Sequence, residues 1–482
     1  MKPLITTLLA IGILAGVIAC GTNGNAQDVP DAVLGNWEGK LKVQAMELRL
    51  VFRFAKTAEK VTAEMDSPDQ GTTGIPVSNV SVNGDQLAIE VSTINGTYSG
   101  TLSPDGNTVD GKWKQSGMEF PLEMKRVSEL TKLNRPQEPQ PPFPYQTEDV
   151  TFKNDPAKIE LAGTLCIPTG DGPFPAAVLI SGSGPQDRDE FLLGHKPFWV
   201  IADDLVRRGI AVLRYDDRGV GKSTGDFGAA TSQDFATDAF AAVKFLQSRG
   251  EIDRGKIGLI GHSEGGLIAP IVAVDHPDAI AFIVMLAGPG LPGDQILEMQ
   301  YQLIGKQSGL SEELLMFTKE NSHKTYEIIK TEPDNQRAAQ KLRDLFDENW
   351  GKMSDSLKAE AQKSGDPKQQ LEQNIQILTN PWFRFFLSYD PRPTLAKVQC
   401  PVLAINGELD LQVPPKENLA AIETALKSGK NSDVTVKEFP KLNHLFQTST
   451  TGGPDEYGNI EETFAPVALD FMGGWIVERF VK

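Results

Sequence analysis

The chain has 482 residues, more than one compact domain usually holds, so we expect two or three folded units. Hydrophobic residues make up 40% of the sequence, which is enough to build real cores and excludes disorder of the whole chain. Its 47 basic and 64 acidic residues give a formal net charge of −17, which disfavours contact with phosphate backbones and excludes nucleic acid as an expected partner.

The N-terminus has the pattern of an export signal. Lys2 precedes an apolar run from Leu4 to Ile18, which is too short and too closely followed by polar residues to span a membrane. The run ends in Val17-Ile18-Ala19-Cys20, which resembles the bacterial lipoprotein box, whose cysteine is lipidated and becomes the mature N-terminus. We therefore expect a signal peptide over 1–19 and a tether over 20–34.

Lipidation of Cys20 would decide where the protein resides. Several acyl chains on one cysteine give stable anchoring, so the expected location is the cell envelope, with the membrane as a partner through the lipid. The alternative is ordinary signal cleavage, for instance after Ala26, which would discard Cys20 and leave a soluble periplasmic or secreted protein. Cys166 and Cys400 lie in apolar runs and are expected to be buried thiols, although a disulfide between them stays open.

Residues 35–127 are expected to form an antiparallel β domain. Short runs with a period of two alternate with turn signals such as Asn83-Gly84 and Asp105-Gly106, a pattern typical of hairpins in a sandwich or small barrel. This region contains no recognisable nucleophile, metal cluster or cofactor loop, so the expected role is that of a spacer or a substrate-gathering module. Prolines are dense over 128–147, which predicts a semi-rigid linker.

Residues 148–482 are expected to form an α/β domain. Strand and helix patterns alternate here, which predicts a doubly wound, mostly parallel sheet whose active site lies beyond the carboxyl ends of the strands. The alternation stops between about 290 and 390, where helical periodicity predicts a cap inserted over that edge. The aromatic run from Trp382 to Leu387 either lines a substrate pocket or fills the core of the cap, and core packing is favoured.

The stretch Gly261-His262-Ser263-Glu264-Gly265 indicates a nucleophilic serine. An apolar strand precedes this stretch and an apolar helix follows it, as in the G-x-S-x-G turn that exposes a serine hydroxyl. A serine needs a base to take its proton, and glycines on both sides leave room for the strained turn. Ser263 is therefore the predicted nucleophile.

The base and its carboxylate partner are sought among loops that follow strands. Of the five histidines, His444 is the one in a loop after the last predicted strand, whereas His262 adjoins the serine and should point away from it. Asp410 follows the preceding strand and is the expected partner of His444, with Glu408 as the alternative carboxylate. Ser, Asp and His in this chain order form the triad sequence of α/β hydrolases.

Two backbone N–H groups are needed to stabilise an oxyanion beside the serine. The first is expected from Glu264, and the second from Ser183 or Gly184 in the glycine-rich loop after the third strand of the α/β domain. The following loop, which begins at Asp216, lacks the spacing of a phosphate cradle. It is expected to be a structural turn held by Asp216 or Asp217 with Arg218.

From about residue 148 onward, the chain resembles bacterial α/β-hydrolase carboxylesterases, and some relatives of the serine aminopeptidase group share that core. The resemblance rests on Ser181-Gly-Ser-Gly-Pro-Gln-Asp-Arg-Asp189, Asp216-Asp-Arg-Gly-Val-Gly-Lys-Ser223, Gly261-His-Ser-Glu-Gly-Gly266, Gly407-Glu-Leu-Asp410 and Asn443-His444. The family commonly has Asp-Arg-Arg-Gly where this chain has Asp-Asp-Arg-Gly, a departure outside the triad. The resemblance implies Ser263, Asp410 and His444 as a triad that hydrolyses small carboxylic esters without a cofactor or metal.

Two other functions are considered. A peptidase or acyl-peptide hydrolase would use the same triad on an amide, which needs firmer protonation of the leaving amine. A non-catalytic lipoprotein would keep the fold and use the β domain to bind an envelope partner, although an intact triad argues against this alternative.

Overall fold

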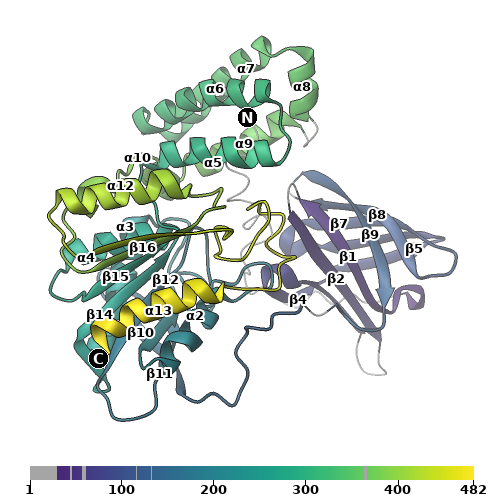
Figure 1. The fold of residues 1–482 in the computed structure, drawn as a ribbon. Coiled ribbons are helices and arrows are strands. Elements are labelled where there is room, and N and C mark those ends of the chain that lie inside the picture. The colour runs from purple at the N-terminus through teal and green to yellow at the C-terminus, as the bar shows by residue number, and fades with distance from the viewer. Residues whose placement is uncertain are drawn as a thin grey trace.

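The computed structural model describes residues 30–43, 46–56, 61–115, 117–131, 133–362 and 366–481. The predicted signal peptide and Cys20 lie outside the described residues. An antiparallel β domain lies beside an α/β domain, and a layer of helices covers one end of the α/β domain (Figure 1). No described helix is both long enough and apolar enough to cross a membrane.

The β domain is an up-and-down meander. Within the described chain its sheet has nine strands in the order β4-β3-β2-β1-β9-β8-β7-β6-β5, with every neighbouring pair antiparallel. Its edge strands β4 and β5 are joined by only Val77 and Ser78, so the sheet has to curl until its two edges approach each other. The strands are β1 (Gly35–Val43), β2 (Met46–Lys56), β3 (Val61–Ser67), β4 (Thr72–Pro76), β5 (Asn79–Asn83), β6 (Gln86–Val91), β7 (Gly96–Leu102), β8 (Thr108–Gln115) and β9 (Met118–Val127).

Aromatic side chains fill the inside of this curled sheet. The rings of Trp37, Phe52, Tyr98 and Trp113 are at most 1% exposed, and the Phe52 ring lies 6.1 Å from that of Trp113 and 6.4 Å from that of Tyr98. Alternate residues face inward, as the period-two pattern predicts. The buried indole N–H of Trp37 donates to Val33 O at 2.7 Å, so no polar cost offsets its burial.

The α/β domain is built on an eight-stranded sheet of the described chain, in the order β10-β11-β13-β12-β14-β15-β16-β17. Five neighbouring pairs are parallel, while β10–β11 and β11–β13 are antiparallel. The expected α/β fold behind an antiparallel β domain is confirmed in outline, and the sheet is mixed. The strands are β10 (Gln146–Asn154), β11 (Ile159–Ile167), β12 (Phe174–Ile180), β13 (Ala211–Tyr215), β14 (Ile252–His262), β15 (Phe282–Leu286), β16 (Val402–Gly407) and β17 (Val434–Phe439).

Both faces of this sheet are buried under helices. On the central strand β12, Val178 and Ile180 belong to the core beneath α3 (Ser232–Ser248), α4 (Glu264–Asp275) and α12 (Pro415–Ser428). Ala177 and Leu179 point the other way, into the core beneath α2 (Pro197–Arg207) and α13 (Pro466–Phe480). Because successive side chains alternate between faces, a strand buried on both sides reads as a continuous apolar run.

A helical insertion between β15 and β16 forms the cap (Figure 1). Its helices are α5 (Gly293–Gln307), α6 (Glu312–Thr331), α7 (Asn335–Lys352), α8 (Asp355–Gln362), α9 (Pro367–Leu378), α10 (Pro381–Ser388) and α11 (Arg392–Leu395). In the aromatic run of α10, Phe383, Phe386 and Leu387 are buried in the core of the cap, whereas Trp382 packs at its margin. Core packing therefore accounts for most of that run.

The two described cysteines are free thiols in separate places. Cys166 is buried in β11, and Cys400 is half-buried just before β16. Burial raises the pKa of the Cys166 thiol, and it raises the pKa of the Cys400 thiol to about 12. Both thiols therefore stay protonated at neutral pH and behave as small apolar side chains.

We expect Phe52→Ala to lower the free energy of unfolding of the β domain by about 3 to 5 kcal/mol, because it empties a fully buried ring site. Thr97→Ala, on the exposed face of β7, is the matched control and should change stability by less than about 0.5 kcal/mol. Urea unfolding followed by tryptophan fluorescence measures both values, and equal midpoints for the two variants would contradict the assigned core.

Candidate active site

Ser263 occupies the tip of the turn between β14 and α4. Its backbone has φ 50° and ψ −117°, a conformation that a non-glycine residue adopts only at a cost. The turn is fixed on both sides, because Ser263 N–H donates to Leu286 O at 2.8 Å and Gly266 N–H donates to Ser263 O at 2.9 Å. The serine side chain is half-buried, whereas its neighbours on both sides are buried.

The glycines of this turn are required by backbone crowding. A Cβ on Gly261 would overlap Gly265 O, and a Cβ on Gly265 would overlap Ile180 O of β12. A Cβ on Gly266 would lie 2.7 Å from the Cα of Gly288. Strand, turn and helix therefore approach so closely that larger residues at these positions would push the serine away from its place.

His444 and Asp410 meet across two loops that follow neighbouring strands. Asp410 comes after β16 and His444 after β17, and His444 Nδ1 lies 2.8 Å from Asp410 Oδ2. The other oxygen, Oδ1, accepts the N–H groups of Gln412 and Val413 at 2.8 and 2.9 Å. Since the carboxylate accepts from Nδ1–H, Nε2 is left as the basic nitrogen. Glu408 lies elsewhere and accepts Lys441 N–H.

The loop that carries His444 is braced by its own buried amides. Asn443 Oδ1 accepts the N–H groups of Leu445 and Gln447 at 3.0 and 2.9 Å, and Asn443 Nδ2 donates to Gln447 Oε1 at 3.0 Å. Gln447 Nε2 in turn lies 3.0 Å from His195 Nε2. His444 itself is 4% exposed, so the imidazole has little freedom to turn.

The Ser263 turn and the His444 loop are in contact. His262 packs its ring 4.9 Å from the His444 ring, and Gly182 of the glycine-rich loop lies against the Ser263 side chain. Among the hydrogen bonds of the described residues, none joins the Ser263 hydroxyl to His444. Catalytic hydrogen bonds are often long in unliganded enzymes and tighten around the substrate. Ser263, Asp410 and His444 are thus brought to one edge of the sheet, with the His444–Asp410 pair already formed.

His262 is held between two acceptors. Its Nδ1 lies 2.9 Å from Glu190 Oε1, and its Nε2 lies 3.0 Å from the backbone oxygen of His444. When Glu190 is ionised, both partners are acceptors, and this arrangement favours the imidazolium ion, in which both ring nitrogens carry hydrogen. Burial lowers the pKa of His262, but the Glu190 carboxylate and the His444 carbonyl outweigh it, so the pKa lies above its ordinary value. His262 thus joins the serine turn to the loop that carries His444.

The glycine-rich loop after β12 is held by three carboxylates. Glu190 Oε1 accepts Gly182 N–H at 2.7 Å, which removes that group from the possible oxyanion donors and leaves the next residues, Ser183 and Gly184. Asp217 accepts the Ser181 hydroxyl and Gln186 N–H, and Asp216 pairs with Arg188.

The turn after β13 differs in one respect from the expectation. Asp216 does hold it, because its carboxylate accepts Lys222 N–H at 3.1 Å, whereas the Asp217 carboxylate accepts from Ser181 and Gln186 of the glycine-rich loop. Arg218, however, pairs with Asp238 of α3 at 2.7 Å rather than with an aspartate of its own loop. The guanidinium therefore joins the turn to a helix, a contact that local spacing does not reveal.

Glu264 links the serine turn to the cap. Its backbone begins α4, so its N–H has no partner within the helix and is available to an oxyanion. Its side chain is 2% exposed, and Oε1 accepts the Ser232 hydroxyl at 2.6 Å and Trp382 Nε1–H of α10 at 2.7 Å. Burial raises the pKa of this carboxyl, against the opposing hydrogen bonds from Ser232, Trp382 and Ser183.

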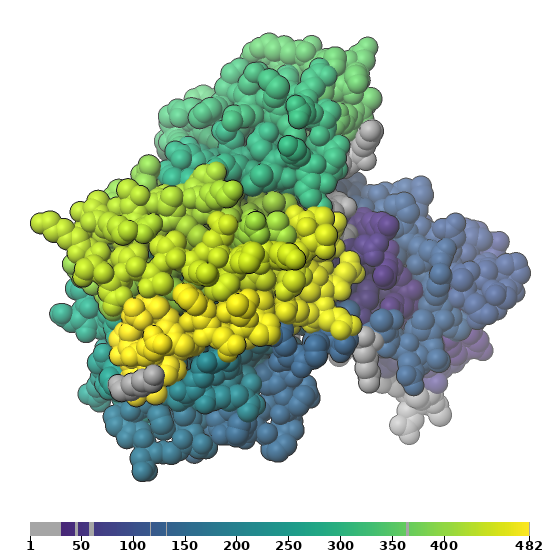
Figure 2. Space-filling model, viewed as in Figure 1, coloured from purple at the N-terminus to yellow at the C-terminus, as the bar shows by residue number. Residues whose placement is uncertain are grey.

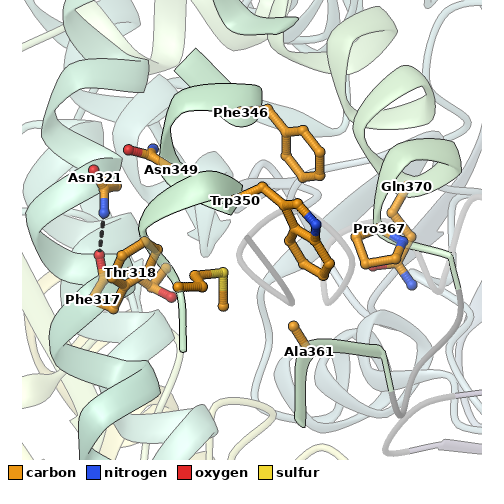
Figure 3. A pocket seen from close by; sticks show the side chains of 10 residues that line it. Phe317, Thr318, Asn321, Phe346, Asn349, Trp350, Ala361, Pro367 and Gln370 are labelled. Atoms are coloured by element: carbon orange, nitrogen blue, oxygen red, sulfur yellow. Dashed lines mark hydrogen bonds between the residues drawn. The ribbon is translucent and has the colours of Figure 1, made fainter. Parts of the chain in front are cut away.

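Two cavities lie away from the serine. One is inside the cap, and its lining includes Trp350, Phe346, Ala361, Pro367, Phe317 and Thr318 (Figure 3). The other is lined by residues that include Glu190, His262, Leu445 and Phe464. Within the described part of the chain, no group of three or more histidine, cysteine or acidic side chains is placed to hold a metal ion.

Sequence reasoning missed the roles of Glu190, His262 and the Glu264 side chain. Glu190 contacts His262 across 72 positions, and its acid-rich loop carries no pattern that would single it out. Glu264 did offer a signal, because a charged side chain beside two glycines on a buried turn needs a partner.

Comparison with known proteins follows the same part of the chain. Residues 157–436 match the family described as X-Pro dipeptidyl-peptidase (S15 family). The chain is 33% identical over 215 residues to Esterase EstD of Thermotoga maritima, which covers 44% of this chain and 48% of that protein. It is 26% identical over 228 residues to Dipeptidyl peptidase family member 6 of Caenorhabditis elegans, covering 43% of this chain and 29% of that protein. The chain thus spans about half the length of the first relative and under a third of the second.

Solved structures are more distant. An esterase of Pyrococcus furiosus, Pf2001, superposes with a TM-score of 0.41 at 16% identity, covering 70% of this chain and 94% of its own. Est1E of Butyrivibrio proteoclasticus, solved with ferulic acid, superposes with a TM-score of 0.40 at 18% identity, covering 69% of this chain and all of its own.

The His262–Glu190 pair predicts a loss of stability as pH rises. A folded-state pKa above the unfolded value of about 6.5 means that the stabilisation is complete below that value and is lost as pH rises through the folded pKa. We therefore expect the melting temperature of the wild type to fall relative to that of His262→Gln between about pH 6 and pH 9. His323→Gln, on an exposed face of α6, should follow the wild type. Parallel curves for the wild type and His262→Gln would rule out the imidazolium.

Proposed function

The chain belongs to the S15 family, described as X-Pro dipeptidyl-peptidase, and from this premise we propose that it is a serine hydrolase that cleaves carboxylic esters through an acyl-enzyme on Ser263. The observation that carries the proposal is the pairing of His444 with Asp410 beside a strained serine turn. The similarity to Esterase EstD favours an ester as the bond that is cleaved.

The proposed reaction begins with attack of Ser263 Oγ on the ester carbonyl carbon while His444 Nε2 takes the hydroxyl proton. The carbonyl π electrons move to oxygen, where Glu264 N–H and the N–H of Ser183 or Gly184 would stabilise the charge. When the tetrahedral intermediate collapses, the C–O bond to the alcohol breaks and His444 gives its proton to the leaving oxygen. Water, deprotonated by His444, then releases the acid and restores Ser263.

Asp410 keeps His444 in this role. Its Oδ2 accepts Nδ1–H and so selects the tautomer whose Nε2 is basic, and the backbone N–H groups of Gln412 and Val413 hold the carboxylate in place. As the imidazole gains a proton during each half-reaction, the neighbouring carboxylate stabilises the cation.

A peptidase is the second candidate, because the family description and the nematode relative both name dipeptidyl peptidases. The two activities differ in the leaving group. Nitrophenyl esters of two to eight carbons and an X-Pro nitroanilide, assayed side by side on the pure protein, would separate them. The proposal expects turnover of esters to exceed that of the anilide, and the reverse order would assign a peptidase.

Ser263→Ala should lower kcat for a short-chain nitrophenyl ester by about 10⁴-fold or more, because the nucleophile is lost while the fold is kept. Ser81→Ala, on an exposed position of β5, is the control and should retain full activity. Substantial hydrolysis by the Ser263→Ala protein at an unchanged melting temperature would refute the assignment.

We also propose that the protein is exported and held in the cell envelope by lipid on Cys20, as Val17-Ile18-Ala19-Cys20 suggests. Cys20→Ala should abolish incorporation of a labelled fatty acid and move the protein out of the membrane fraction. Cys400→Ala should change neither property. Membrane association of the Cys20→Ala protein equal to that of the wild type would contradict the anchor.

A further inference from the structure

The hydrophobic core of the β domain extends into the loops of the active site. Leu193, Leu445 and Tyr457 of the α/β domain are 4%, 7% and 2% exposed and belong to the same apolar cluster as Trp37 and Phe52. Leu445 directly follows His444. Figure 2 shows the C-terminal segment, in yellow, lying against the first strands of the β domain, in purple.

A second contact reaches Glu190. Gly71, which ends the short helix η2 (Pro68–Gln70) of the β domain, lies against Phe191, and a Cβ added there would be 2.9 Å from the ring. Phe191 directly follows Glu190. Glu190 Oε1 accepts Gly182 N–H of the glycine-rich loop and lies 2.9 Å from His262 Nδ1. Through His262, the same carboxylate reaches the backbone oxygen of His444. A short chain of contacts therefore joins the β domain to the catalytic groups.

The linker that follows the β domain is bound to both domains by hydrogen bonds. Arg135 donates to four backbone oxygens of the α/β domain, at 2.8 to 3.3 Å, namely those of Leu193, Gly194, Gly458 and Ile460. Gln137 bonds both N–H and O of Phe464. On the other side, Arg49 is buried against Asp69 in the β domain and donates to Thr131 O of the linker at 2.7 Å.

These contacts differ from those of a spacer. Interfaces between domains of one chain are usually small and polar, and relative motion is then the default. Here the shared side chains are as buried as a domain core, and the loops they hold are the ones that carry His444 and Glu190. The β domain also meets the cap, because Gly117 at the β8–β9 turn lies against the Gln369 side chain of α9.

We propose that the β domain is a positioning module of the active centre, which holds the Glu190 and His444 loops in the geometry that the reaction needs. The proposal rests on the proposed hydrolase function for its kinetic consequence. Its structural part, that contacts from the β domain order these two loops, stands independently of the bond that is cleaved. Gly71 and Arg135 are then positioning residues, which act through the loops that they contact.

The test replaces Gly71 by asparagine, the larger residue that best tolerates a positive φ. Gly71→Asn should displace Phe191. Gly84→Asn is a matched control, because φ is +65° at Gly71 and +64° at Gly84, while nothing lies within 4 Å of a Cβ added at Gly84. We expect hydrogen–deuterium exchange over residues 187–195 and 441–449 to quicken at least tenfold in Gly71→Asn only. For a nitrophenyl ester, kcat should fall about tenfold or more with KM within about twofold, because misplaced catalytic groups cost turnover rather than binding.

A second pair covers the case in which Gly71→Asn does not fold. Arg135→Lys keeps the charge but cannot reach four oxygens at once, and it should give the same exchange and kcat changes. Arg53→Lys, whose partners Glu64 and Asp66 lie within the β domain, is its control. Wild-type exchange in both loops and wild-type kcat in Gly71→Asn and Arg135→Lys would overturn the proposal. If the wild type cleaves no ester, the proposed function fails, and the exchange rates still decide this inference.

Discussion

Backbone crowding at the turn between β14 and α4 sets the layout of the whole site. Gly261 and Gly265 leave no space for a Cβ, so the three residues between them have to diverge. His262 turns toward Glu190 and the backbone of His444, Ser263 stands at the tip, and Glu264 reaches under the cap to Trp382. One strained turn thereby connects the His444 loop, Ser263 and the cap, and the strain is supported by core strands on both sides.

Local chemistry explains which parts could be predicted from the sequence. Backbone sterics and burial act over a few residues, so they leave short patterns in the sequence. Such patterns predicted the glycine turn, the chain order of Ser263, Asp410 and His444, and the alternation of strands and helices. Glu190, Arg135 and the Arg218–Asp238 pair could not be predicted in this way. The contacts of Glu190 with His262, of Arg135 with Ile460 and of Arg218 with Asp238 join residues that are 72, 325 and 20 positions apart, and nothing near them in the sequence marks the contact. The antiparallel pairing of β10 with β11 and of β11 with β13 could not be predicted either, because parallel and antiparallel buried strands have similar apolar sequences.

The contacts of the β domain give it a different role from the one that the sequence patterns predict. Sequence patterns describe it as an independent hairpin domain without chemistry of its own, and the strands do form a closed aromatic core. That core, however, also takes in Leu445 next to His444, and the linker that follows it is bound through Arg135 rather than free. Contacts from outside the α/β sheet thus help to order the His444 and Glu190 loops, and fixing the backbone of these loops has a cost in conformational entropy that such contacts offset.

The most direct test of the account is to trap the covalent intermediate. The wild-type protein, mixed with a nitrophenyl ester and quenched in acid within the first turnovers, should carry one acyl group, and peptide mass spectrometry should place it on Ser263. An adduct on another residue, or rapid ester hydrolysis with no acylated protein at any time point, would contradict the central claim.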